Sequence, residues 1–429
     1  MFFVVIFLAL NFLTSASEDA LTWPKWVYMT CIVLFMVYTD FDFTFRKTTY
    51  SSLILRQYGR VLLLVFLALG YTFLLACVYN YALYDWVTDF WGFIPLLLSF
   101  SFANLFPERK QWLQIFSLLI LLGVASSVRD LVVYSSSSEV VITSRLVSLQ
   151  MANVDYFVAA NICIGFLIFY ENKALFRLSL VSLPILLYRT ALTGNRSMVI
   201  LLSLGVLTML VKRLVARKDP RSGAARKSRH LGVSLAALIF VASTVLVAGG
   251  DALQRAVDVY STRFVLMDTG AYFRLIEANV VWNEFREHPL GAGFGSSAYF
   301  PGTEVFTAEA MPNKTWVHNL FLYCMWKLGV FGIIVFVWLT VKLAKVFKWT
   351  WKRDDALPFI ACLLVIQYAA YAMVETYYRR HDYNMIIGLV CGFLIYNWYS
   401  RTLTISKVKR DAGAYRHERY LPHTATEVP

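Results

Sequence analysis

The residue best suited to chemistry in this sequence is a histidine where a polar segment meets an apolar run. His318 stands in Trp316-Val317-His318-Asn319, directly before the apolar residues 320–339. An imidazole at a boundary between water and lipid can exchange protons and still be held rigidly. We therefore predict that His318 marks an active site. The alternative is a polar residue at the membrane boundary whose hydrogen bonds are satisfied and which has no catalytic role.

Arginines around a short turn could bind an anion. Thr193-Gly194-Asn195 is typical of a turn, so Arg196 should open the next helix. A guanidinium beside the free N–H groups of a helix start suits a phosphate. Arg189 precedes the same turn and is a weaker candidate for phosphate or acceptor binding. The alternative for both is an arginine that extends to the lipid head groups.

A second turn, 375–383, gathers acidic and basic residues near the C-terminal end of the apolar region. Arg379 and Arg380 lie in it. They could bind an acceptor or a phosphate, because guanidinium groups donate several hydrogen bonds in a fixed geometry. The alternative is a solvated loop with internal ion pairs.

The segment before His318 has a helical pattern and further arginines. Apolar residues recur at helical spacing from Asp268 to Glu287, and the pattern ends before Pro289. Arg274 lies within this predicted helix, and Arg263 precedes it. Both arginines supply positive charge on the same predicted side as His318, with surface salt bridges as the alternative.

A glycine-rich stretch, 291–295, follows the predicted helix with the pattern Gly-x-Gly-x-Gly. No strand precedes it and no βαβ unit follows, which excludes a dinucleotide site. We predict a tight turn that lets the backbone approach another segment closely.

Lys327 is the one basic residue inside the apolar run that follows His318. Nine residues separate the two, so on a helix they point roughly in opposite directions. An unpaired lysine between membrane helices is costly. We therefore expect an acidic group or a carbonyl to contact Lys327.

The composition shows which elements must position these residues. The chain has 429 residues, of which 59% are hydrophobic and 16% are charged, and long apolar runs recur throughout. This pattern predicts an all-α polytopic membrane protein, because a membrane barrel would alternate polar and apolar residues. We expect a transmembrane domain over 1–400 and about twelve transmembrane helices, near 1–16, 24–40, 61–80, 89–104, 112–128, 153–170, 178–190, 198–212, 232–249, 318–341, 356–374 and 385–400.

The distribution of lysine and arginine predicts the orientation of these helices. Most basic residues fall in alternate short loops, of which 213–231 is the most basic. The positive-inside rule then places both termini and the disordered tail 401–429 in the cytoplasm. The largest loop, 250–317, lies on the outer side with His318 and is expected to contain short helices.

Several classes of protein are excluded. The net charge of +13 resides in short loops between apolar runs, so it indicates membrane topology and no nucleic-acid partner. The six cysteines all fall in apolar runs, as buried core residues do. The sequence contains neither a phosphate-binding GxxxxGK[ST] motif, nor an HExxH zinc motif, nor a GxSxG nucleophile motif. We predict no metal site and no cofactor.

Three segments in the same order resemble the O-antigen ligase/polymerase superfamily. His318-Asn319, nine residues, then Gly329 and Gly332 fit its His-[Asn/Ser/Gln]-x9-Gly-x2-Gly pattern. The segment 193–200 resembles its Arg-x3-Leu motif, with Ile200 in place of leucine. The segment 273–293 is similar to the region that precedes the histidine in the same proteins. The resemblance covers about 190–335.

The resemblance implies a GT-C-like fold and a metal-independent, inverting-type glycosyltransferase. Such proteins use a glycan on undecaprenyl diphosphate at the outer, periplasmic face of the bacterial inner membrane. By this likeness His318 would be the general base or orient the acceptor, and Asn319 would fix the imidazole or bind sugar. Arg196 and Arg274 would hold the diphosphate, with Arg263 in reserve for Arg274.

The resemblance leaves the acceptor open. We expect a polymerase that joins repeat units of a surface polysaccharide or exopolysaccharide. The alternatives are an O-antigen ligase, which transfers glycan to the lipid A-core of lipopolysaccharide, and a transferase to protein. A lipid-linked glycan transporter or flippase is an alternative from a different class. Expected partners are the lipid-linked glycan, the acceptor, membrane lipids, and flippase and chain-length regulator proteins.

Overall fold

The structure is a computed structural model. It describes residues 30–32, 34–35, 49–135, 155–169, 172–193, 196–216, 269–301, 313–381 and 383–400. The predicted spans 1–16 and 232–249, most of the basic loop 213–231 and the tail 401–429 lie outside these residues. The described part of the outer loop 250–317 consists of 269–301 and 313–317.

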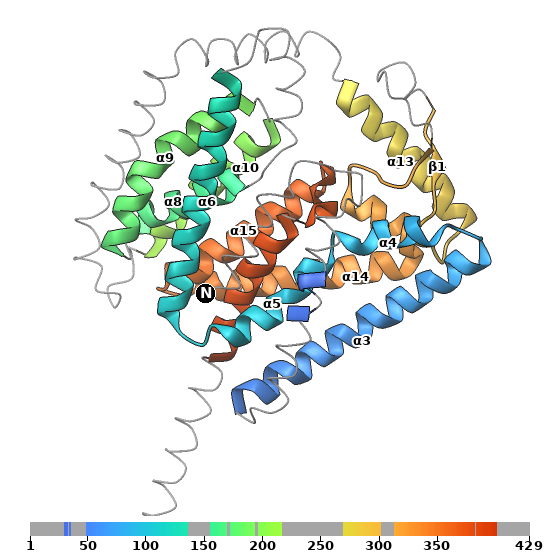
Figure 1. The fold of residues 1–429 in the computed structure, drawn as a ribbon, viewed down its shortest axis with the longest axis horizontal. Helices are drawn as coiled ribbons and strands as arrows, with labels where there is room; N and C mark the ends of the chain where they lie inside the picture. Colours follow the sequence, from blue (N-terminus) through green and yellow to red (C-terminus); the bar gives the residue numbers. More distant parts are fainter. Residues whose placement is uncertain are drawn as a thin grey trace, which may run out of the picture.

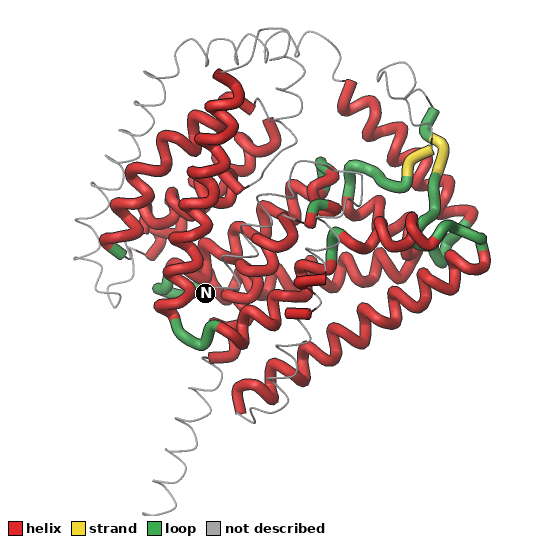
Figure 2. Tube along the Cα trace, in the orientation of Figure 1, coloured by secondary structure: helices red, strands yellow, loops and turns green. Residues whose placement is uncertain are grey.

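The described chain is helical almost throughout, as the composition predicts (Figure 1). Two short strands, β1 (Ala298–Tyr299) and β2 (Asn313–Lys314), pair in antiparallel fashion beside α13 (Figure 2). Residues 383–400 form the last helix of the described part of the chain. The other elements are α3 (Thr49–Val78), α4 (Leu83–Trp91), α5 (Ile94–Leu105), α6 (Arg109–Ser135), α8 (Asp155–Phe169), α9 (Lys173–Thr193), α10 (Arg196–Ala216), α13 (Thr269–Glu287), α14 (Leu320–Trp351), α15 (Ala356–Ala372) and the 3₁₀-helix η3 (Thr376–Arg379).

Length and apolarity qualify four described helical segments as membrane spans. These are 59–78 of α3, 109–132 of α6, 197–215 of α10, and α14, which Gly329 divides into two parts. The pair α4 and α5 makes a fifth if it is counted as one span bent by 45°. Together with two shorter apolar helices, α8 and α15, they describe an integral membrane protein. The full plan of twelve spans stays a prediction.

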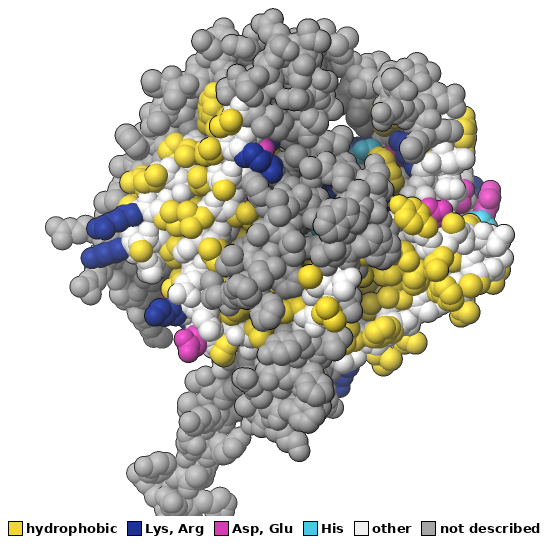
Figure 3. Space-filling model, in the orientation of Figure 1, with side chains coloured by type: hydrophobic (Ala, Val, Ile, Leu, Met, Phe, Trp, Pro, Cys, Tyr) yellow, Lys and Arg dark blue, Asp and Glu magenta, His cyan; other side chains and the backbone are white. Residues whose placement is uncertain are grey.

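The short helices α8 and α15 form the centre of the bundle. Nearly all their side chains are buried; α8 packs against α6, α9 and α10, whereas α15 packs against α8, α10 and α14. A helix that is hydrophobic on every side belongs inside a larger protein or bundle. The outer helices instead expose apolar side chains, which cover α3 and the opposite edge of the described surface (Figure 3).

The apolar run after His318, expected as one span, is broken at Gly329. This residue has φ of 60° and ψ of −140°, a conformation that residues other than glycine avoid. A straight helix would hold Phe321 and Phe336 about 22 Å apart at 1.5 Å per residue. Their ring centroids are only 5.1 Å apart. The chain therefore folds back at Gly329, and the short segment 320–328 packs against the longer one that follows.

The predicted glycine turn supports this break. Ala292 N–H donates to the carbonyl of Trp326 at 2.9 Å, and Gly293 N–H donates to that of Lys327 at 3.0 Å. Both carbonyls lose their helical partners where the helix stops. A Cβ on Gly291 would lie 2.6 Å from the Lys327 carbonyl oxygen. The close backbone approach expected from the glycine pattern is thus confirmed, and α14 is what it approaches.

Candidate active site

His318 lies against a buried carboxylate from α13. Its ring Nδ1 is 2.7 Å from Oε1 of Glu277, and its backbone N–H donates to Oε2 at 2.9 Å. The Glu277 side chain is 4% exposed, whereas that of His318 is 30% exposed. One edge of the imidazole is therefore fixed by the protein, and the rest of the ring remains accessible.

The two contacts determine how the imidazole can act. An ionised carboxylate only accepts hydrogen bonds, so a proton on Nδ1 satisfies Oε1. In the neutral ring the lone pair then belongs to Nε2, which can accept a proton from another molecule. The arrangement therefore leaves one ring nitrogen able to accept a proton from another molecule.

The backbone around His318 is held from two further elements. The Asn319 side chain caps α14 by accepting from Leu322 N–H at 3.1 Å, and it donates to the carbonyl of Met373 at 2.9 Å. The Tyr378 hydroxyl donates to the carbonyl of Val317 at 2.6 Å. These bonds tie the start of α14 to the end of α15 and to η3. Because both bonds of the Asn319 amide go to backbone groups, Asn319 positions the chain beside His318.

Arg274 lies on the same helix as Glu277, one turn before it, and pairs with a carboxylate from the turn 375–383. Its Nη2 is 3.5 Å from Oε1 of Glu375, and its side chain is 41% exposed. Burial raises the pKa of the Glu375 carboxyl above its usual 4.5, while His318 and Arg274 lower it and Glu277 raises it. The charges of His318, Glu277 and Arg274 therefore all act on the Glu375 carboxyl group.

An aromatic ring covers one side of His318. Trp316 meets the imidazole edge to face, with centroids 5.2 Å apart. The guanidinium of Arg379 lies 6.0 Å from the centre of the same indole, and the ammonium of Lys314 lies 5.1 Å from it. Two cations thus contact the tryptophan that packs on His318, and one of them, Arg379, comes from the turn 375–383.

Lys327 is held by a second buried carboxylate. Its Nζ is 2.7 Å from Oδ2 of Asp89 and donates to the carbonyl of Ser296 at 2.6 Å. Gly295 N–H donates to the same Oδ2 at 2.8 Å. The expectation of an acidic or carbonyl partner for Lys327 is confirmed, and both kinds are present. The pair joins α4, the glycine turn and α14.

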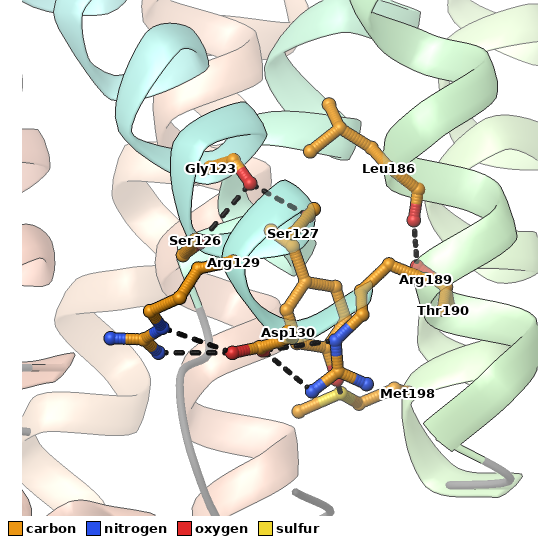
Figure 4. Close-up of polar contacts among 10 residues, drawn as sticks. Gly123, Ser126, Ser127, Arg129, Asp130, Leu186, Arg189, Thr190 and Met198 are labelled. Atoms are coloured by element: carbon orange, nitrogen blue, oxygen red, sulfur yellow. Dashed lines mark hydrogen bonds and ion pairs between the residues drawn. The ribbon is translucent and has the colours of Figure 1, made fainter. Parts of the chain in front are cut away.

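Arg189 lies in a different cluster, at the ends of α6 and α9 (Figure 4). Its Nη2 donates to Oδ2 of Asp130 at 2.8 Å, and its guanidinium lies 5.0 Å from the centre of the Tyr156 ring. Arg129 donates to the other oxygen of Asp130 at 3.0 Å. Arg189 is 3% exposed and supports the packing of α6, α8 and α9.

The remaining predicted site residues are placed as follows. Arg196 begins α10, as the turn before it predicts, but its side chain lies outside the described part of the chain. Arg263 also lies outside the described residues. Arg380 directly follows η3, and its side chain is buried. Within the described residues no group of three or more His, Cys, Asp or Glu side chains could hold a metal ion.

Glu277 and Asp89 are the residues that sequence reasoning did not single out. Glu277 lies three positions after Arg274, so the two share a face of a helix. That spacing is the only signal of its importance in the sequence. The partners His318 and Glu277 are 41 positions apart, and Lys327 and Asp89 are 238 apart, so their pairing follows from the fold.

The fold and this cluster together define a helical integral membrane protein with an acid–base site beside an arginine. Residues 178–337, which include Arg274, Glu277 and His318, match the family model described as O-antigen ligase. The match supports membership of the chain in the O-antigen ligase/polymerase superfamily, and hence an enzymatic function in glycan transfer of the ligase or polymerase type. No curated protein sequence matches the chain.

Proposed function

We propose that this protein transfers a glycan from a lipid-linked diphosphate to an acceptor hydroxyl, with His318 as general base. The acceptor oxygen bonds to the anomeric carbon of the donor while the bond from that carbon to the diphosphate oxygen breaks. The electron pair leaves with the lipid diphosphate, and the acceptor proton passes to Nε2 of His318. Attack opposite the leaving group inverts the anomeric centre.

One observation carries the proposal: a partly exposed histidine is held by a buried carboxylate, beside an exposed arginine, within the O-antigen ligase match. A positioned general base typically contributes about 10²–10⁴-fold to a rate. A diphosphate is already a good leaving group. Positioning and charge stabilisation are therefore the main tasks left to the protein.

Arginines would stabilise the charge that develops on the diphosphate. Arg274 reaches the site from α13, and its 3.5 Å contact with Glu375 is longer than a strong charged hydrogen bond, so a more highly charged anion can compete for the guanidinium. Arg196 and Arg263 complete the proposed diphosphate set. Arg379 and Arg380 are proposed on the acceptor side. In this scheme the arginines supply the positive charge that a divalent cation supplies in other transferases.

We further propose that undecaprenyl diphosphate is the lipid, that the reaction takes place at the outer face of the bacterial inner membrane, and that the product is a lengthened polysaccharide. Transfer to lipid A-core is the second candidate, because the matched family is described as O-antigen ligase. Transport without chemistry is less well supported. Lys327, a charge inside the apolar run that a transporter would use to line its pathway, is fully buried and paired with Asp89.

The test uses the full-length protein in lipid nanodiscs, supplied with undecaprenyl-diphosphate-linked repeat units, with and without a chelator. The polymerase proposal predicts longer lipid-linked glycans in both conditions. Product on lipid A-core, offered in a parallel reaction, would identify a ligase. Movement of lipid-linked glycan across vesicle membranes without new glycosidic bonds would overturn the transfer mechanism, and strict dependence on added Mg²⁺ or Mn²⁺ would overturn the proposed role of the arginines.

A further inference from the structure

Glu277 contacts His318 through both of its carboxylate oxygens, although a buried acid could find its hydrogen-bond donors on several different residues. One carboxylate oxygen accepts from the backbone N–H of His318 at 2.9 Å, and the other lies 2.7 Å from ring Nδ1. Both oxygens are thus directed at a single residue, 41 positions away in the sequence. The acid therefore fixes the backbone and the ring of His318 together.

Burial makes this arrangement rigid. The Glu277 side chain is 4% exposed and lies on α13, a helix of 19 residues that packs against α14. A carboxylate removed from water needs hydrogen-bond donors, and His318 supplies two of them. The imidazole cannot rotate about its own axis without breaking the shorter contact. Trp316, with its ring centroid 5.2 Å away, limits the rotation further.

We propose that Glu277 is the positioning residue of this enzyme: it keeps the proton of His318 on Nδ1, fixes the plane of the ring, and leaves Nε2 to accept the acceptor proton. This inference rests on the proposed function, because it assumes that His318 is the base. Glu277 itself need not touch either substrate.

The charges around His318 favour this division of roles. Glu277 and Arg274 face it from α13 and Glu375 from the segment after α15, while Arg379 and Lys314 contact the ring of Trp316. When His318 takes the acceptor proton it becomes a cation. The carboxylate 2.7 Å away stabilises that cation at the moment when it forms, which is the requirement for catalysis.

Replacement of Glu277 by glutamine tests whether the side chain orients His318 or only fills space between the helices. Glu277→Gln keeps the size of the side chain but has only one accepting oxygen. If that oxygen accepts from the backbone N–H, the amide NH₂ faces Nδ1 and donates to it, and the proton then belongs on Nε2. The base is lost although the ring stays in place.

The experiment measures initial rates of glycan transfer for wild type, Glu277→Gln, Glu277→Asp and Glu287→Gln in nanodiscs. Glu287 is the matched control, an exposed glutamate at the end of the same helix. We expect kcat of Glu277→Gln to fall about 10²–10⁴-fold while KM for the donor changes by less than about threefold. Glu277→Asp keeps the charge and should recover part of kcat, and Glu287→Gln should match wild type.

A spectroscopic measurement reports the tautomer directly. Nitrogen NMR of histidine-labelled protein, with the spectrum of His318→Gln used to identify the His318 signals, should show the proton on Nδ1 in the wild type. In Glu277→Gln it should move to Nε2. The measurement is made at a pH where the ring is neutral. A wild-type proton on Nε2 would overturn the proposal whatever the rates are.

Failure of this inference can be told apart from failure of the proposed function. Full activity of His318→Ala would remove the base and with it the proposed mechanism. If His318→Ala is inactive but folded Glu277→Gln has wild-type kcat, His318 stands as the base and Glu277 does not position it. Equal losses in the Gln and Asp variants, with an unchanged tautomer, would also overturn the positioning role.

Discussion

Two carboxylate pairs flank the short helical segment 320–328, and they differ in one respect. At its start His318 meets Glu277 at 2.7 Å, and near its end Lys327 meets Asp89 at the same distance. In both pairs the acid is buried. The His318 side chain, however, is 30% exposed, whereas Lys327 is 0% exposed. The difference separates the proposed base, which a substrate can reach, from a cation that is wholly enclosed by its partners.

The comparison shows that one short segment carries both a residue with a proposed catalytic role, at its start, and a residue that joins neighbouring elements, near its end. Lys327 donates to Asp89 and to Ser296, which joins α14 to α4 and to the glycine turn. A buried ion pair contributes little net stability, but loss of one partner is costly because the other charge then remains buried and unpaired. His318 instead keeps Nε2 away from Glu277, so its pair has a reactive end.

The largest effect on activity is expected at His318. His318→Ala should lower glycan transfer by about 10²–10⁴-fold, because the base is removed while the arginines remain. The change creates space that water can fill at a half-exposed position. The melting temperature measured in nanodiscs should therefore shift by only a few degrees. Wild-type product levels would contradict the assignment of the base.

The largest effect on stability is expected at Lys327. Lys327→Met removes the 2.7 Å partner of the buried Asp89 carboxylate and leaves the more distant guanidinium of Arg379, 3.9 Å from Oδ1, which should lower the free energy of unfolding by about 3–5 kcal/mol. The double variant Asp89→Asn/Lys327→Met removes both charges and should recover most of that loss. Unfolding in mixed detergent measures the change. A stable single variant would show that the two pairs differ less than the structure indicates.

A smaller effect is expected at Arg274. Arg274→Gln removes a cation proposed to contact the diphosphate, and loss of a charged hydrogen bond of about 1.5–3 kcal/mol should raise KM for the lipid-linked donor about 10–100-fold. Initial rates at varied donor concentration measure it. Arg286→Gln, at an exposed position on the same helix, is the control. If both variants behave alike, Arg274 does not bind the donor.

The smallest effect concerns the dependence of stability on pH. Burial raises the pKa of Glu375 above 4.5, so between the unfolded and the folded pKa the folded protein holds a proton there that the unfolded chain has released; above both values Glu375 is the carboxylate that pairs with Arg274. Stability from this group is full below the unfolded pKa and is lost as pH rises through the folded pKa. Glu375→Gln should flatten that part of the curve. Melting temperatures measured from pH 4.5 upward test it, and unchanged curves would contradict it.

Local patterns predicted much of the site before its contacts were known. Proline and apolar spacing predicted α13 within one residue at its start, turn residues predicted that Arg196 opens a helix, and glycine spacing predicted a close backbone approach. These features depend on the conformational preferences of neighbouring residues. The same reasoning expected an uninterrupted span after His318. It did not predict the reversal at Gly329, because the fit of glycine to positive φ becomes visible only with the turn that packs against it.

The sequence by itself determined a helical membrane protein, its likeness to a glycan-transferring superfamily, and the residue types at the site. Apolar runs and local motifs carry that information within a few turns of chain. Only the tertiary structure decided which acid serves which base. Glu277 pairs with His318 and Asp89 with Lys327 because α13, α4 and α14 pack together, and two acids of equal chemistry are distinguished only by the distance and burial that packing imposes.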